Sequence, residues 1–216
     1  MSELVWAPIH KALDERARLG DRLNWVVAPF VKLAALERLF ESTSPVKGFK
    51  LICRWRPGDL VVGVSDLAVF HFLQERGCQL FVNRQIHMKL YVFESNIALS
   101  TSGNLTLRGL GYVDPSQANI EVGSTVELNA SDWVNLYRVI AGSRVVTQEI
   151  YDRFETFVKA QPPPPSIPEA PDLLGPAKKY TLTSLPATDS PEELTKFYFD
   201  PADYQNSTET ARRAFH

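Results

Sequence analysis

The chain has 216 residues, 44% of them hydrophobic and 22% charged, and its formal net charge at pH 7 is -2. This composition is ordinary for a globular domain with one sizeable core, and the slight negative charge argues against tight nucleic-acid binding through charge alone. No apolar run approaches the ~18 residues that cross a bilayer, and the N-terminus lacks a basic region before an apolar core, so we expect a cytoplasmic protein with no membrane contact.

Helical and strand patterns alternate through the first 160 residues. Apolar residues at helical spacing predict helices over residues 9–19, 33–40, 64–77, 135–140 and 145–158. Short apolar or alternating runs predict strands over residues 24–29, 49–54, 78–82, 89–93 and 97–101. Ser65-Asp66 is expected to cap the third helix, which Gly77 ends. This order predicts an α/β fold with a mixed, mostly parallel sheet flanked by helices on both faces.

The composition changes after residue 160, which we take as the end of the domain formed by residues 1–160. Residues 161–176 are dense in proline, which cannot continue a helix, so this segment is expected to be an extended linker. Residues 177–216 form a C-terminal tail, whose aromatic cluster at residues 197–199 indicates docking on protein. The tail would wrap the domain, latch onto a partner subunit, or lead to another element.

Three residues with phosphate-binding chemistry come from one predicted hairpin. His87 and Lys89 are two positions apart at the start of its first strand, so their side chains leave the same face. After the second strand, a loop through Ser102, itself a candidate for substrate binding, brings the amide of Asn104 back beside the start of the hairpin. An isolated His-x-Lys is more often a surface lysine beside a satisfied histidine. The three groups together instead predict a site where one phosphate meets all of them.

This arrangement resembles the motif of the phospholipase D superfamily, in which His-x-Lys is followed by an Asp, a pair of small residues and an Asn. The corresponding residues here are His87, Lys89, Glu94, Ser102, Gly103 and Asn104. Glu94 replaces the usual Asp, and the small pair reads Ser-Gly instead of Gly-Ser. The resemblance covers residues 25–126. It implies a phospholipase D-like fold and phosphodiesterase activity, with His87, Lys89 and Asn104 as catalytic residues.

Residues 119–122, Asn-Ile-Glu-Val, resemble the strand with which the nuclease branch of that superfamily supplies a carboxylate to its histidine. On this resemblance Glu121 is the fourth catalytic residue; an exposed glutamate at a strand end is the alternative. An imidazole is a competent nucleophile near neutral pH when a carboxylate fixes its tautomer. Lys89 and Asn104 would stabilise the phosphoryl oxygens, a role that a metal ion has in other nucleases.

Attack and leaving-group protonation call for two histidines, whereas the four histidines of this chain include one His-x-Lys. We therefore expect a homodimer in which His87 and its symmetry mate share one site. The resemblance implies the same arrangement, because single-motif relatives include small bacterial endonucleases and metal-independent restriction enzymes.

Two arginines, Arg54 and Arg56, follow the second predicted strand, and open α/β sheets bind ligands beyond the carboxyl ends of their strands. Either could hold a phosphate that flanks the scissile one. Pairing with Asp59 or Asp66 is an equally good explanation for them. Arg108, after the Asn104 loop, could contact a nucleic-acid backbone or simply be solvated.

The two cysteines, Cys53 and Cys78, lie in apolar strand-like runs and have no metal-ligand spacing around them. They are expected to be core thiols of a protein in a reducing compartment. We expect neither a metal ion nor another cofactor.

Positive charge is concentrated around the motif, because residues 47–108 hold 8 basic and 4 acidic residues. The leading hypothesis is a metal-independent endonuclease that hydrolyses DNA through a phosphohistidine intermediate, in restriction or defence. A phospholipid substrate, or a decayed dimerisation or nucleic-acid-binding module, is the alternative. The sequence has no recognisable DNA-reading motif, so loops, the tail or an additional subunit would supply sequence specificity.

Overall fold

The computed structural model describes residues 4–162. The expected tail and all but the first two residues of the expected linker lie outside this range. The helices are α1 (His10–Arg18), α2 (Leu33–Thr43), α3 (Pro57–Val61), α4 (Val69–Gln74), α5 (Leu107–Leu110), α6 (Ala130–Ala141) and α7 (Gln148–Lys159). The strands are β1 (Leu4–Trp6), β2 (Leu23–Val27), β3 (Lys50–Cys53), β4 (Gln79–Val82), β5 (Leu90–Phe93), β6 (Ile97–Thr101), β7 (Val122–Glu127) and β8 (Arg144–Val145).

The strands form one sheet in the order β1-β7-β6-β5-β2-β3-β4-β8. The pairs β2–β3 and β3–β4 are parallel, whereas the other five neighbouring pairs are antiparallel. The sheet is therefore mixed, as expected, but the expectation of a mostly parallel sheet is wrong. Parallel neighbours need a long crossover, which α2 supplies before β3, and α3 with α4 before β4, whereas β5 and β6 are joined by a tight turn.

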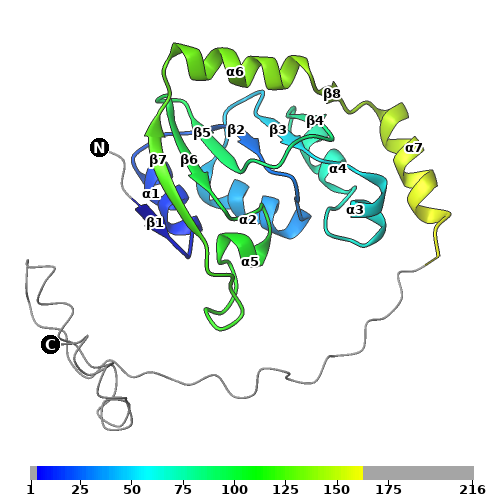
Figure 1. Cartoon of the computed structure of the whole chain (residues 1–216), viewed down its shortest axis with the longest axis horizontal. Helices are drawn as coiled ribbons and strands as arrows, with labels where there is room; N and C mark the ends of the chain where they lie inside the picture. The colour runs from blue at the N-terminus through cyan, green and yellow to red at the C-terminus, as the bar shows by residue number, and fades with distance from the viewer. Residues whose placement is uncertain (1–3, 163–216) are drawn as a thin grey trace, which may run out of the picture. The chain divides into compact units, whose positions relative to one another are not determined.

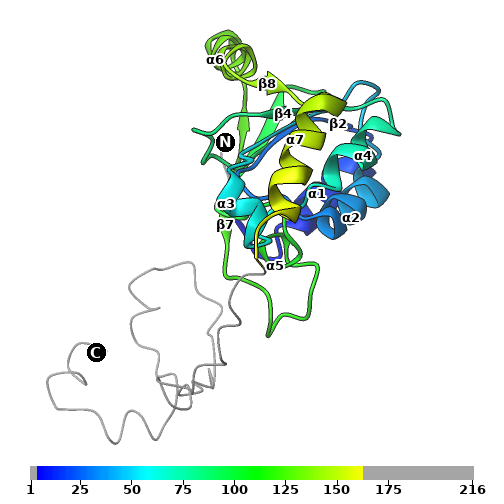
Figure 2. The same ribbon diagram turned by 90° about the vertical axis from the view of Figure 1, so that its right-hand side faces the viewer.

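Helices cover both faces of the sheet, as predicted. Figures 1 and 2 show α6 along one face and α1, α2, α4 and α7 on the other. Successive strand residues alternate between the two cores because their side chains point to opposite faces. The core under α6 contains Trp25, Ile52 and Val92, and the larger core contains Val26, Leu51 and Tyr91. The central strands are thus buried on both faces, which explains why they read as continuous apolar runs.

The predicted helix over residues 64–77 is shorter in the structure, where α4 begins at Val69 and has no side-chain cap. The prediction that Ser65-Asp66 caps it is wrong. The Ser65 hydroxyl instead accepts a hydrogen bond from the Val31 backbone N–H at 3.2 Å, and the Asp66 carboxylate accepts one from the Leu33 N–H at 2.8 Å. Both side chains thereby tie this segment to the chain that follows β2, an interaction between segments that a local capping pattern does not reveal.

The last two helices also differ from the predicted bounds. Asn129 caps α6, its side chain accepting from the Ser131 and Asp132 N–H groups, so this helix begins before residue 135. The helix predicted to begin at Val145 begins later: Arg144–Val145 pairs with β4 as β8, and α7 begins after Thr147, whose hydroxyl accepts from the Ile150 N–H. None of the helices in residues 4–162 is both long and apolar enough to span a membrane.

Candidate active site

The β5–β6 hairpin forms as predicted, but the prediction that His87 and Lys89 lie on its first strand is wrong, because β5 begins at Leu90 and both residues precede it. Its turn contains Asn96 with a φ of 65°, a left-handed conformation that Asn tolerates better than most residues. Glu94 precedes this turn, with its backbone N–H donating to the Arg22 carbonyl oxygen at 3.0 Å. Glu94 therefore lies at the opposite end of the hairpin from His87. Its difference from the Asp of the superfamily motif leaves the strand pairing intact.

Strand register brings the motif residues onto the same end of β5, β6 and β7. The Thr101 N–H donates to the Lys89 carbonyl oxygen at 3.1 Å, and Thr101 pairs with Gly123. The Ser102 N–H donates to the Val122 carbonyl oxygen at 2.9 Å, so the β6–β7 register continues past Thr101. His87 precedes β5, Gly103 follows β6 and Glu121 precedes β7, so all three lie just beyond the paired residues at this end of the sheet.

The missing side chain of Gly103 leaves room for the side chain of Glu121. The Cγ atom of Glu121 lies 3.5 Å from the position that a Cβ atom would take on Gly103. The Glu121 side chain therefore leans over this glycine.

The Glu121 carboxylate has two donors of its own. The Ser102 hydroxyl and the Asn119 amide both donate to it, the latter at 3.1 Å. Within residues 4–162, neither the exposed His87 imidazole nor the half-buried Lys89 ammonium has a hydrogen-bond partner. The role of Glu121 as the group that orients His87 stays a prediction. Ser102 contacts this carboxylate, a contact that the sequence analysis did not foresee.

Asn104 is held in place by the chain that follows β2. The Lys32 N–H donates to the Leu105 carbonyl oxygen at 2.9 Å, and Leu105 forms a β-bridge with Val31. The Asn104 side-chain oxygen, Oδ1, is buried and accepts no hydrogen bond within the described part of the chain. Leaving a buried polar atom unpaired costs about 1–3 kcal/mol, so such atoms in a native fold call for an explanation such as ligand binding.

Tyr91 has a second buried oxygen without a hydrogen-bond partner among the described residues. Burial raises the pKa of its hydroxyl, and the nearby Tyr112 hydroxyl and Glu121 carboxylate raise this pKa further. Tyr91 lies on β5, two positions after Lys89 in the sequence, and its side chain is part of the larger core. The hydroxyl is therefore a neutral polar group near the Glu121 carboxylate.

The sequence matches no protein-family profile and no curated protein. Among solved structures, the chain is similar to Nuc of Salmonella typhimurium, a phospholipase D family member, with a TM-score of 0.51 and 12% identity over 68% of this chain and 99% of Nuc. The chain has the phospholipase D fold. It is also similar to NucT from Helicobacter pylori, with a TM-score of 0.46 and 11% identity over 65% of this chain and 95% of NucT. For the phosphatidylserine synthase of Haemophilus influenzae Rd KW20, the TM-score is 0.49 and the identity 15% over 73% of this chain and 43% of the synthase.

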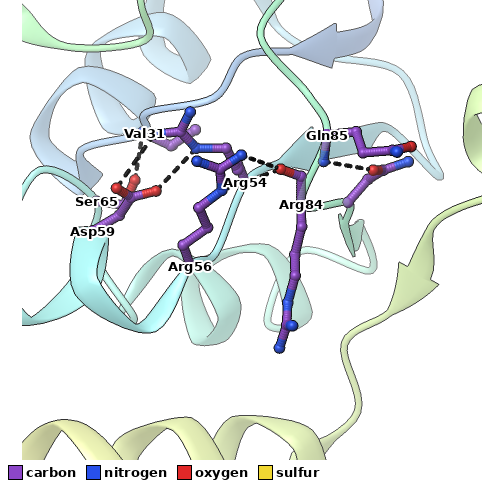
Figure 3. Close-up of polar contacts among 8 residues, drawn as sticks. Val31, Arg54, Arg56, Asp59, Ser65, Arg84 and Gln85 are labelled. Atoms are coloured by element: carbon purple, nitrogen blue, oxygen red, sulfur yellow. Dashed lines mark hydrogen bonds and ion pairs between the residues drawn. The ribbon is translucent and has the colours of Figure 1, made fainter.

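In the phospholipase D fold, Arg54 and Arg56 follow β3 and Arg108 lies in α5, but each of these candidates donates within the protein. Arg54 donates through Nε and Nη2 to the Asp59 carboxylate, at 3.0 and 3.3 Å, which is the pairing left open by the sequence. Arg56 donates to the Arg84 carbonyl oxygen at 2.8 and 3.2 Å, and Figure 3 shows both contacts. Arg108 donates to the Gln117 carbonyl oxygen at 2.8 Å. Phosphate binding by these three arginines stays a prediction.

Another arginine of this phospholipase D fold was missed by the sequence analysis. Arg84 follows β4 as Arg54 follows β3, and it is exposed. The same strand-end argument that selected Arg54 applies to Arg84, but Arg84 is two residues beyond the end of its strand and was overlooked. Its surroundings are taken up below.

The cysteines agree with the sequence analysis in part. Cys53 is buried, and burial raises the pKa of its thiol. Cys78 is half-buried against the larger core, and desolvation raises the pKa of its thiol as well. The described residues contain no group of three or more His, Cys, Asp and Glu side chains gathered as a metal site would need.

Proposed function

We propose that this chain is a metal-independent phosphodiesterase of the nuclease type that hydrolyses DNA. The observation that supports it most is that the Glu121 side chain lies beside Gly103 at the end of the sheet where the Thr101 N–H also donates to the Lys89 carbonyl oxygen. The unpaired Asn104 oxygen lies in the loop that directly follows Gly103. These residues lie in the segments next to the paired strands β5, β6 and β7, which supports a common site.

In the proposed reaction, a nitrogen of the His87 imidazole attacks the phosphorus atom, and the bond to the leaving oxygen breaks. The departing oxygen takes a proton from a second imidazole, and a phosphohistidine remains. Water then attacks phosphorus, its proton passes to the second imidazole, and the phosphorus–nitrogen bond breaks. Lys89 and the Asn104 amide stabilise the negative charge on the phosphoryl oxygens, while Glu121 fixes the tautomer of His87.

The second imidazole is the reason for a homodimer in this proposal. Each chain has one His-x-Lys, so the partner subunit's His87 would act as the general acid across a twofold axis. His87 and Met88 are exposed in the single chain, which leaves them available for such an interface. The resemblance to single-motif restriction enzymes extends the proposal to a restriction or defence role.

Cleavage in the absence of metal ions tests the chemistry directly. The full chain is incubated with supercoiled plasmid and with single-stranded DNA in excess EDTA. We expect cleavage by the wild type and a loss of at least about 10²-fold in rate for His87→Ala and Lys89→Gln. The matched controls His71→Ala and Lys11→Gln change the same residue types outside the motif and should cleave at the wild-type rate.

Three outcomes would overturn the proposal in different ways. DNA binding without cleavage by the wild type would favour a nucleic-acid-binding module. Hydrolysis of phosphatidylcholine vesicles in place of DNA would favour a phospholipase. Cleavage that persists in His87→Ala would exclude the phosphohistidine. For the dimer, mixing wild type with excess His87→Ala should reduce activity roughly as the square of the wild-type fraction, whereas a linear decrease would contradict a shared site.

A further inference from the structure

A pocket of about 550 Å³ lies beyond the carboxyl ends of β3 and β4. Its walls come from the segments after these strands, from the α6–β8 connection and from α7. Its volume is within the range of about 300–1,000 Å³ that is typical of small-ligand sites. The side chains that distinguish this pocket are three arginines and three aromatic residues: Arg84, Arg144, Arg153, Trp55, Phe154 and Phe157.

The three arginines are exposed and have no carboxylate to pair with. None of their guanidinium groups makes a hydrogen bond or ion pair within residues 4–162, and no Asp or Glu lines the pocket. The Arg84 side chain extends away from its own carbonyl, where Arg56 donates (Figure 3). By contrast, Arg54 and Arg56 both have internal acceptors. Arg84, Arg144 and Arg153 therefore keep their donors available for an anion, and the planar guanidinium suits phosphate.

The aromatic side chains give this basic pocket an apolar wall. The Phe154 ring meets the Trp55 ring edge to face, with centroids 5.5 Å apart. Phe157, one helical turn further along α7, keeps 44% of its surface exposed. The Trp55 ring is 1% exposed, and its Nε1–H donor is buried without a partner among the described residues. An indole N–H can only donate, so a ligand with acceptor oxygens would satisfy it.

We propose that this pocket binds an unpaired nucleotide of the substrate strand, next to the nucleotide whose phosphate is cleaved. The inference rests on the proposed nuclease function. Arg84 is three residues before His87. Both residues lie in the segment that joins β4 to β5, so this segment contributes to the pocket and to the motif at the same end of the sheet. The arginines hold phosphate oxygens, and the base lies against the exposed Phe157 ring.

The size of the pocket favours single-stranded over duplex nucleic acid. Bases in a duplex are stacked and paired, so an aromatic side chain in a pocket of this size cannot reach their faces. An unpaired nucleotide presents its base and phosphate together, which matches a pocket with rings and guanidinium groups. A duplex would contact the exposed arginines through its backbone and gain nothing from Phe157.

Binding of a labelled oligonucleotide tests the pocket separately from the chemistry. The probe is fluorescein-labelled dT12, its anisotropy is measured with the full chain in EDTA, and the His87→Ala background prevents cleavage. We expect Arg153→Gln, Arg144→Gln and Phe157→Ala each to weaken binding about tenfold. Each arginine variant should also lower the slope of log K against log salt by about 0.7, as loss of one phosphate contact would. Arg18→Gln, an exposed arginine on α1, is the matched control and should change neither quantity.

Turnover of bis(p-nitrophenyl) phosphate, which has no flanking nucleotide, separates this inference from the proposed function. With His87 intact, the pocket variants should cleave this small diester at the wild-type rate. If the pocket variants bind dT12 more weakly but even the wild type does not cleave the diester, the nucleotide pocket is supported and the nuclease function is refuted. If the pocket variants bind dT12 as tightly as the wild type, the proposed nucleotide pocket is refuted. It is also refuted if Phe157→Ala weakens the binding of a labelled duplex as much as that of dT12. A poly-glutamate peptide that displaces dT12 only when the arginines are present would assign the pocket to an acidic peptide instead.

Discussion

The Cγ atom of Glu121 lies 3.5 Å from the position of a Cβ atom on Gly103, and the Gly109 carbonyl oxygen is closer still to that position. A methyl group at residue 103 would clash with the Gly109 carbonyl group, which can move only together with the backbone around it. We expect Gly103→Ala to lower the free energy of unfolding by about 1–3 kcal/mol and to reduce DNA cleavage. Gly58→Ala is the control, because nothing lies within 4 Å of its Cβ position in α3. Urea unfolding measures the stability of both variants, and equal free energies of unfolding would contradict the close packing at Gly103.

Glu121 accepts hydrogen bonds from Ser102 and Asn119, which makes these residues positioning groups for the proposed site. Ser102→Ala removes one donor. It should lower the rate of DNA cleavage about tenfold and the free energy of unfolding by about 1 kcal/mol. Ser116→Ala is a matched control, since it removes a hydroxyl that donates to Asp114 at 2.6 Å in an exposed loop. Cleavage rates in EDTA compare the two. Wild-type cleavage by Ser102→Ala would show that the Ser102 contact is not needed to place the carboxylate.

The Arg54–Asp59 ion pair is predicted to stabilise the fold. Its side chains are 12% and 17% exposed, and the Arg54 guanidinium also lies 4.7 Å from the centre of the Phe30 ring. A double-mutant cycle with Arg54→Gln and Asp59→Asn should give a coupling energy of about 1–3 kcal/mol. The control pair, Arg76 and Glu75, is 45% and 74% exposed and should couple by less than about 1 kcal/mol. If the Arg54–Asp59 coupling were no larger, Arg54 would be free to bind phosphate at little cost.

The Tyr91 hydroxyl is buried without a hydrogen-bond partner among the described residues, so its removal should not lower the free energy of unfolding. We expect Tyr91→Phe to leave stability unchanged or to raise it by up to about 1 kcal/mol. Tyr151→Phe is the control, because the Tyr151 hydroxyl donates to Glu155 at 3.1 Å and its loss should destabilise by about 0.5–1.5 kcal/mol. A marked loss of stability in Tyr91→Phe would reveal a partner for this hydroxyl.

The same tyrosine predicts a pH dependence. Burial raises the pKa of folded Tyr91 above its ordinary value of 10.0, so above pH 10 the unfolded chain loses this proton while the folded chain keeps it. Tyr91 therefore favours unfolding as pH rises past 10, by about 1.4 kcal/mol for each pH unit between the two pKa values. Tyr91→Phe should lose this contribution. Urea unfolding of both proteins at pH 9 and pH 11 measures it, and parallel losses of stability would contradict it.

The sequence by itself determined the β5–β6 hairpin, the helices α1 and α2 of the larger core, and the phospholipase D fold. Apolar periodicity and the tight turn at Asn96 are local properties that one segment expresses alone. The face shared by His87 and Lys89 stays a prediction, because both residues precede β5.

Only the tertiary structure decided the antiparallel majority of the sheet, the contact of Ser102 with Glu121, and the partners of the arginines. Ser65 and Asp66 look like a helix cap locally, yet they bind the chain after β2. Arg54 meets Asp59, whereas Arg84, Arg144 and Arg153 come together from three separate segments. The physical reason is that the partners of a polar side chain depend on which segments the fold brings within ~3 Å of it, and local sequence patterns do not contain that information.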